Sequence, residues 1–208
     1  MYKNIYEDDW LIVVDKSAGV PTQPDKSGMT SLLESLGDVK LIHRLDQRVS
    51  GLIVFAKTDE VAAKLSADFQ KRVVEKKYRA VVGNKPSLDL ALLTHWLLKD
   101  TRKNMAKAHD KEVKNAQKAQ LSYRLINSTQ RYHLLEIELM TGRFHQIRCQ
   151  LSAIGCPIVG DLKYGFKRSS PDGSIFLQSY HLAFEHPKTN QPMTFEIEMP
   201  EIWKKYGF

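Results

Sequence analysis

The sequence predicts an α+β fold, with a mixed but mostly antiparallel sheet and flanking helices and loops. Short strand patterns occur along the whole chain, whereas helical periodicity is confined to a few stretches. Some strand candidates alternate apolar and polar residues, as in hairpins with one face in water. This pattern differs from the continuous apolar strands of a doubly wound parallel sheet.

Strand and helix signals in the first part of the chain are well separated. We expect strands at Leu11–Val14, Gly51–Ala56 and Tyr78–Val82, because each is a short run rich in β-branched or apolar residues. Thr58 is placed to cap a helix between the last two strands. An apolar residue recurs at every fourth position from Val61 to Phe69, which gives this helix one buried face.

The second part of the chain contains a clear strand followed by a helix. Leu135–Leu139 alternates apolar and acidic residues, the pattern of a strand with one wet face. A helix is expected at Arg143–Ile154, and a glycine and a proline shortly after it supply a stop signal. Further strands are expected at Leu121–Ile126, Ser174–Leu177 and Thr194–Ile197.

Composition favours a single soluble domain with a polyanionic partner. The 208 residues carry a formal net charge of +7 and a pI near 9.3. No apolar run has transmembrane length, and the polar N-terminus is unlike a signal peptide. Cys149 and Cys156 have neither a disulfide framework nor metal-ligand spacing. We therefore expect a cytoplasmic protein with reduced thiols and no membrane association.

Positive charge is concentrated between Lys99 and Lys118. This stretch contains seven basic residues against three acidic ones. Charge patterning leaves two interpretations open, a segment that grips a nucleic acid and a solvated face or mobile loop.

Arg148 lies at the border of the apolar stripe of the expected helix, so its guanidinium should point toward protein. A buried guanidinium keeps its proton and therefore needs a carboxylate partner. Asp46 is a candidate, because it follows an apolar stretch and precedes a buried strand. Such a pair would keep Asp46 ionised for nucleophilic chemistry, although a purely structural ion pair is an equal alternative.

Several segments, in order along the chain, resemble the RluA-type pseudouridine synthase family. DKSAGV resembles its N-K-P-A-G turn, and HRLDQRVSGL resembles H-R-L-D-x-x-T-S-G-L, which bears its catalytic aspartate. KKYRAVV resembles K-x-Y-x-A-x-V. TGRFHQIR, followed by GDLKYG, resembles T-G-R-x-H-Q-I-R…G-D-x-x-Y-G. The segments occupy residues 15–20, 43–52, 76–82, 141–148 and 160–165.

Some positions depart from the family pattern. Val49 stands in place of threonine and Ser17 in place of proline, both as local packing changes. Phe144 replaces a small Thr or Ser, Gln150 replaces His, and Leu177–Ser179 replaces L-H-A. These departures concern the outer pocket and the choice of target. Relatives often carry an N-terminal S4 domain, and we expect none here.

The resemblance implies a single catalytic domain over residues 1–208, with the pseudouridine synthase fold. It implies that the protein isomerises uridine to pseudouridine in structured rRNA or tRNA, as a monomer without cofactor or metal. The uridine would be flipped out of its helix. Asp46 would then attack the base or C1′, or remove the ribose 2′ proton, and the sequence does not choose between these routes.

The resemblance also implies roles for other residues. Arg148 would hold Asp46, and Tyr78 would stack on the base and assist proton removal. Arg44 would brace the space left by the base, with a plain phosphate contact as the alternative. Further expected RNA contacts are His43, Lys77, Lys103, Lys107, Arg143, His145 and Gln146, although His145 also suits a structural role.

One alternative function belongs to another class. An RNA-binding or RNA-remodelling protein with weak or lost catalysis would share the basic charge and the RNA contacts. The presence of Asp46, Tyr78 and Arg148 argues against such a loss.

Overall fold

The structure, a computed structural model, describes residues 1–208, and its backbone groups into two compact units. Unit 1 consists of Met1–Lys76 together with Gln178–Glu198, and unit 2 consists of Lys77–Leu177 together with Met199–Phe208. Each unit is described by itself below. Unit 1 is thus assembled from two separate stretches of the chain.

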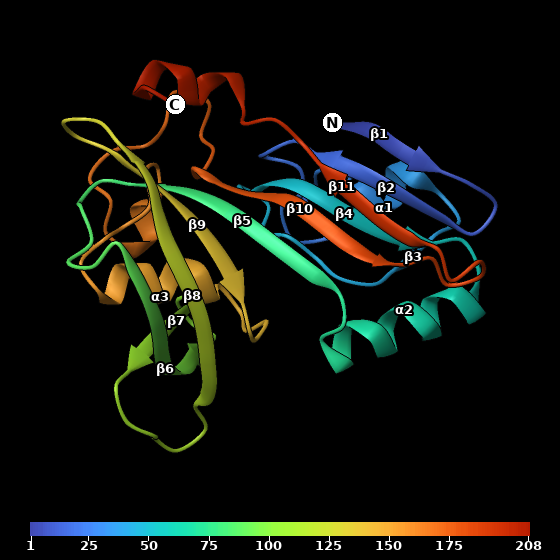
Figure 1. The fold of residues 1–208 in the computed structure, drawn as a ribbon, viewed down its shortest axis with the longest axis horizontal. Coiled ribbons are helices and arrows are strands. Elements are labelled where there is room, and N and C mark those ends of the chain that lie inside the picture. The colour runs from blue at the N-terminus through green and yellow to red at the C-terminus, as the bar shows by residue number, and fades with distance from the viewer. The chain divides into compact units, whose positions relative to one another are not determined.

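Unit 1 contains a mixed sheet that confirms the expected architecture (Figure 1). Its pairs are antiparallel, except that β4 and β10 run parallel through Ser50↔Gln178 and Gly51↔Ser179. The spatial order is β1-β2-β4-β10-β11, and β3 also pairs with β4. The strands are β1 (Tyr2–Glu7), β2 (Leu11–Lys16), β3 (Lys40–Leu41), β4 (Ser50–Ala56), β10 (Leu177–Glu185) and β11 (Pro192–Glu196).

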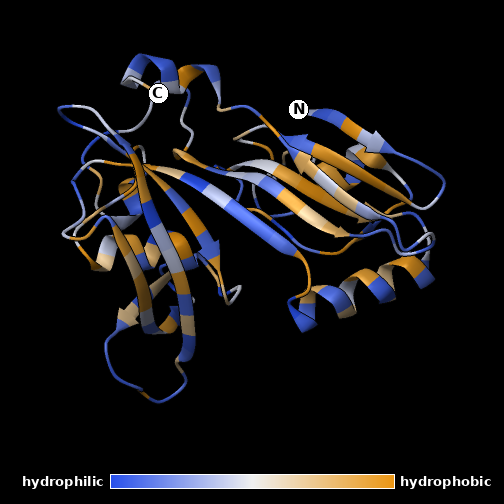
Figure 2. Cartoon of the chain, in the orientation of Figure 1, coloured by the Kyte–Doolittle hydropathy of each residue, from blue (hydrophilic) through white to orange (hydrophobic).

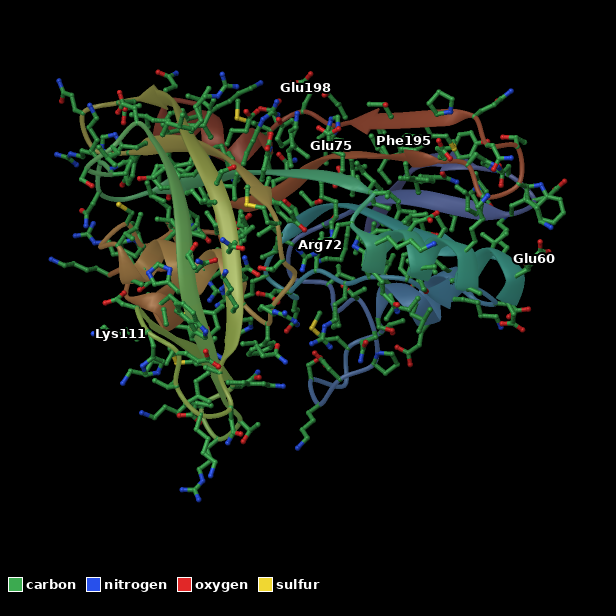
Figure 3. All side chains as sticks on the ribbon, turned by 60° about the horizontal axis from the view of Figure 1, so that its bottom comes forward. Glu60, Arg72, Glu75, Lys111, Phe195 and Glu198 are labelled. Carbon is green, nitrogen blue, oxygen red and sulfur yellow. The ribbon has the colours of Figure 1, made fainter.

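Two helices accompany this sheet, α1 (Leu32–Leu36) and α2 (Asp59–Lys71). As expected, Thr58 caps α2, and its side chain accepts the Val61 N–H. Val61 and Leu65 are buried in one cluster with apolar residues of β2 and β4, which Figure 2 shows as largely hydrophobic strands. Glu60 and Arg72 mark the two ends of α2 in Figure 3. The amphipathic face predicted for this helix therefore closes the core of unit 1.

Unit 2 contains an antiparallel sheet of order β5-β9-β8-β6-β7. Helix α3 packs against β6 and β7, where Leu97, Ala106, Ala119, Cys149 and Tyr164 form a buried cluster. The elements are β5 (Glu75–Val82), β6 (Leu90–Asp100), β7 (Met105–His109), β8 (Gln117–Ser128), β9 (His133–Leu139), α3 (Gln146–Ala153), and the short 3₁₀ helices η1 (Leu162–Tyr164) and η2 (Glu201–Tyr206). None of the helices in either unit has the length and apolar character needed to cross a membrane.

Three expectations about the elements were wrong. Helix α3 begins at Gln146 and not at Arg143, because His145 has a left-handed φ of 51°. The expected strand Ser174–Leu177 is irregular up to its last residue, where β10 begins. The stretch from Lys99 to Lys118 is no mobile loop, because it contains β7 and the adjoining ends of β6 and β8. Strands β1, β3, β6 and β7, helix α1 and the part of β10 beyond Leu177 were not anticipated.

Gly51 allows the parallel approach of β4 to β10, and its replacement tests that pairing. Its φ is 123°, and a Cβ atom there would overlap the backbone of Ser179. We expect Gly51→Ala to lower the free energy of unfolding by about 2–4 kcal/mol, through backbone strain and overpacking. Urea unfolding measures this loss. Gly28→Ala is the matched control, because Gly28 also has positive φ but open space around it. Equal losses in the two variants would contradict the steric explanation.

Candidate active site

Asp46 lies in the loop of residues 42–49, between β3 and β4 of unit 1. The preceding residue, Leu45, is buried, and its backbone is held on both sides by the Thr22 hydroxyl. This hydroxyl donates to the Leu45 carbonyl at 2.8 Å and accepts the Leu45 N–H at 3.3 Å. The Asp46 carbonyl accepts the Val49 N–H at 3.0 Å. The half-buried Asp46 is therefore presented from a fixed turn.

Lys16 fastens the same loop to the end of β2. Its side chain is fully buried, and its ammonium donates to the carbonyl oxygens of Ser17 (3.0 Å), Val20 (2.9 Å) and Gln47 (3.2 Å). Gly19 adds a reciprocal pair of bonds, because its N–H donates to the Gln47 carbonyl and its own carbonyl accepts from the Gln47 amide. The two sequence segments singled out in unit 1 thus meet at the residue that follows Asp46.

The electrostatic environment of Lys16 is unusual for a lysine. Burial lowers the pKa of its ammonium to about 7, although the negative charges of Asp46 and Asp15 act in the opposite direction. Burial also raises the pKa of Asp15, against the effect of Lys3 and Lys16. Unit 1 therefore holds a titratable ammonium whose charge acts on Asp46.

His43 is engaged within unit 1. Its Nε2 accepts the Val54 N–H at 3.2 Å, and its ring stacks on Phe69 with centroids 4.6 Å apart. Burial, aided by the charge of Lys76, holds the pKa of His43 well below its usual value, so the ring is neutral. These contacts give His43 a structural role, and its expected RNA contact stays a prediction. Arg44, the next residue, is exposed.

In unit 2, Arg148 on α3 is buried against Asp161. Arg148 Nε lies 2.7 Å from one Asp161 oxygen, and Nη2 lies 2.9 Å from the other. The exposed fractions of the two side chains are 6% and 0%. The inference that Arg148 needs a carboxylate is confirmed, and Asp161 supplies one. The predicted pairing with Asp46 stays a prediction, because Asp46 belongs to unit 1.

Tyr164 connects Arg148 with the residues before α3. Its ring lies 5.0 Å from the Arg148 guanidinium carbon, in a cation–π contact. Its hydroxyl accepts the Ala106 N–H at 2.7 Å and lies 3.0 Å from His145 Nδ1. Burial raises the pKa of Tyr164 to about 12, so the phenol keeps its proton. The segments 141–148 and 160–165 therefore form one network.

Tyr78 and Lys77 are neighbours on β5 with opposite surroundings. The Tyr78 side chain is buried, and the residue pairs with Ile137 of β9. Lys77 pairs with Glu138 across the same strands, and its ammonium lies 3.8 Å from the Glu138 carboxylate. The expected RNA contact of Lys77 would therefore compete with this partly exposed ion pair.

Gln146 and Arg143 both form hydrogen bonds to neighbouring segments of unit 2. The Gln146 side chain is buried and accepts from Thr141 Oγ1 and the Arg143 N–H, while its amide donates to the Gln120 carbonyl. These bonds give Gln146 a role in positioning this turn, and its expected RNA contact stays a prediction. Arg143 donates to the Lys118 carbonyl at 3.2 Å and lines a cavity of about 190 Å³.

Phe144 and Lys99 line the same cavity, and the Lys99 ammonium lies 4.6 Å from the Phe144 ring centroid. Phe144 also stacks on His145, with centroids 3.8 Å apart. Lys103 and Lys107 are exposed, in the β6–β7 turn and on β7 respectively. Figure 3 shows Lys111 pointing outward from the following loop. The basic residues of this region are thus displayed on a strand pair.

Sequence reasoning missed the roles of Lys16, Asp161 and Tyr164, although all three lie inside segments that it quoted. Lys16 and Asp161 both stand near glycine turns in the sequence, but the burial of their side chains could not be predicted from residue spacing. No group of three or more His, Cys, Asp or Glu side chains is arranged to hold a metal ion.

Comparison with known proteins gives consistent matches. The family described as RNA pseudouridylate synthase matches residues 10–153, a range that contains Asp46, Tyr78 and Arg148. Ribosomal large subunit pseudouridine synthase D of Zymomonas mobilis is 34% identical, over 95% of this chain and 69% of its own length. tRNA pseudouridine synthase C of Vibrio cholerae is 30% identical, over 98% and 93%. The structure of human RNA pseudouridylate synthase domain containing 1 has the same fold, with a TM-score of 0.79 at 20% identity over 98% of this chain and 86% of that one.

The Arg148–Asp161 pair is expected to be a large stabilising contact. Asp161→Asn keeps the shape of the side chain but removes the charge beside a buried guanidinium, so the free energy of unfolding should fall by about 3 kcal/mol. Denaturant unfolding measures the change. Glu201→Gln, in the exposed Lys204–Glu201 pair, is the control and should cost less than about 1 kcal/mol. A loss no larger for Asp161→Asn than for Glu201→Gln would contradict this assignment.

The buried Lys16 should make stability depend on pH. An unfolded lysine has a pKa of about 10.4, so above pH 7 the unfolded chain binds more protons than the folded one. Stability should therefore rise between pH 7 and 8.5, by up to about 1.4 kcal/mol per pH unit from this group.

Lys16→Met should be less stable at every pH and should lose this rise, whereas the exposed control Lys71→Gln should keep it. Urea unfolding at several pH values compares the slopes. A slope unchanged in Lys16→Met would refute the titration of Lys16.

Proposed function

Because this chain belongs to the RNA pseudouridylate synthase family, we propose that it isomerises uridine to pseudouridine in structured ribosomal or transfer RNA, with Asp46 as the catalytic carboxylate. Relatives named for the ribosomal large subunit and for tRNA both match, which supports these two classes of substrate. The observation that carries the assignment to Asp46 is its loop, which is bound through Leu45 by Thr22 and through Gln47 by Lys16.

Asp46 suits this chemistry because its position is fixed before substrate binds. The reaction breaks the N1–C1′ bond of uridine, turns the base and joins C5 to C1′, so no atoms are gained or lost overall. A carboxylate held by its backbone neighbours costs little reorganisation when it attacks the base or C1′, or removes the 2′ proton.

Tyr78 and Arg148 are proposed to act on the same uridine. A buried tyrosine offers a flat apolar ring for a flipped base, and its hydroxyl can exchange a proton with a carbon centre. Arg148 is pre-organised by Asp161 and Tyr164, and this rigid guanidinium suits the proposed pairing with Asp46.

RNA binding is proposed to use the exposed cations. Arg44 would enter the space left by the base or bind a phosphate, and Arg143, Lys103 and Lys107 would bind phosphates. Each phosphate contact releases counterions, so affinity should fall steeply with salt. His145 borders this surface, but its bond to Tyr164 favours a positioning role.

We further propose that both units together make up one catalytic domain, which acts as a monomer in the cytoplasm. The two free, buried cysteines, Cys149 and Cys156, agree with a reducing compartment.

Replacement of Asp46 tests the proposed function. Asp46→Asn should lower the rate of pseudouridine formation by more than about 1000-fold, since a residue required for the chemical step is lost. The measurement is pseudouridine mapping in total RNA from cells without the gene, after incubation with each purified protein. Asp38→Asn changes an exposed carboxylate in the same unit and should retain full activity. No new pseudouridine with the unmodified protein would favour an RNA-binding protein without catalysis, and an unchanged rate with Asp46→Asn would contradict the role of Asp46.

A further inference from the structure

Unit 2 contains a second hollow, which the proposed function does not use. It is a cavity of about 900 Å³ between the residues after β5, the β8–β9 turn, the segment after η1, and η2. We call it the β5-end cavity and define it by the residues used below: Lys85, Arg131, Tyr132, Phe166, Lys167, Arg168 and Tyr206. Its volume lies in the range of sites that hold small organic ligands.

The charged side chains that line this cavity are all basic. Lys85, Arg131, Lys167 and Arg168 line it, and no carboxylate does. His133 also lines it, but burial and the charge of Lys85 lower the pKa of this histidine. Asp172 acts electrostatically on Tyr206, but its carboxylate is already bound by the Ser174 N–H and hydroxyl. The cavity therefore attracts an anion with several charges.

Its aromatic walls are held in place by the protein core. Tyr206 meets Tyr132 edge-on, with ring centroids 5.1 Å apart, and packs on the buried Phe176 at 4.6 Å. Phe166 lies against Gly83, where an added Cβ would come within 2.6 Å of its ring. Rigid aromatic faces beside mobile cations are the combination that binds single-stranded nucleic acid, because bases stack while phosphates pair with the cations.

We propose that the β5-end cavity is a second RNA site, which binds a single-stranded nucleotide segment flanking the target uridine. Gly83 follows β5, whose other part carries Tyr78. Gly83 lies five positions beyond Tyr78 along the chain, a span of about 16 Å. An RNA strand of a few nucleotides covers this distance. The inference rests on the proposed function in taking RNA as the polyanion and Tyr78 as a residue that contacts the target uridine.

Binding of a labelled oligoadenylate of twelve nucleotides tests the cavity apart from the chemistry, because this RNA contains no uridine. Fluorescence anisotropy gives its affinity at several salt concentrations. Lys167→Gln with Arg168→Gln should weaken binding about tenfold, and should reduce the salt slope by about 1.4, or roughly 0.7 for each lost phosphate contact. Tyr132→Leu should weaken binding about tenfold without changing the salt slope.

Lys3→Gln with Lys71→Gln is the matched control, because it removes two exposed charges from unit 1. This control should bind as the unchanged protein does. Equal weakening by the control and the cavity variants would show nonspecific attraction and overturn the proposal. Unchanged binding by the cavity variants would overturn it as well.

Two further arms identify the ligand. Adenosine monophosphate or polyglutamate that competes as well as unlabelled oligoadenylate would overturn the RNA assignment. Photo-crosslinking with 8-azidoadenosine in the oligonucleotide should label Tyr132, Phe166 or Tyr206, and labelling confined to other peptides would overturn the site. Asp46→Asn should bind oligoadenylate as the unchanged protein does. If the proposed catalysis fails, the result of the binding experiment therefore still stands on its own.

Discussion

A guanidinium keeps its proton at any pH that a protein meets, so burying Arg148 obliges unit 2 to place a carboxylate beside it. Asp161 does so with both oxygens, which brings the turn after the Val159–Gly160 stretch against α3. Tyr164 follows one turn later, under the guanidinium, and its hydroxyl reaches His145 and the backbone of β7. Lys16 imposes the same kind of constraint on unit 1, where three carbonyl groups must converge on its ammonium.

The parts of the fold that could be predicted are those where a local rule and the tertiary environment agree. Thr58 caps α2. Val61 and Leu65, which begin the apolar repeat at every fourth position, are buried as this periodicity predicts. Strands β2, β4, β5, β8 and β9 coincide with the expected apolar or alternating runs. The long strand β6 was not predicted because its exposed positions carry Leu90 and Leu92. Apolar and polar residues therefore do not alternate there as they do in a half-buried strand. The start of α3 was misplaced because a left-handed φ at His145 leaves no mark in the hydrophobic pattern.

The sequence predicted some residues of the candidate site but not the residues that they contact, and this difference has a physical reason. Asp46 and Arg148 could be predicted as site residues from the sequence segments that contain them, because a carboxylate and a guanidinium each have one dominant chemistry. Their partners could not, because burial of a short polar side chain depends on segments that are remote in sequence. Asp161 and Lys16 show this limit, and so does Gln146, whose side chain bonds to Thr141, Arg143 and the Gln120 carbonyl of β8. The Nε2 atom of His43 likewise accepts the Val54 N–H.

The parallel contact at Gly51 has a consequence for how the protein is made. Strand β4 is synthesised early, but its neighbour β10 leaves the ribosome only after all of residues 77–177. During that interval unit 1 lacks both β10 and β11, so the highly apolar strand β4 lies at the edge of the sheet with unpaired backbone groups. Unit 2, whose sheet is built from consecutive chain, can become ordered first. A nascent chain stalled within this interval would present an open β edge, the state most prone to aggregate or to engage a chaperone.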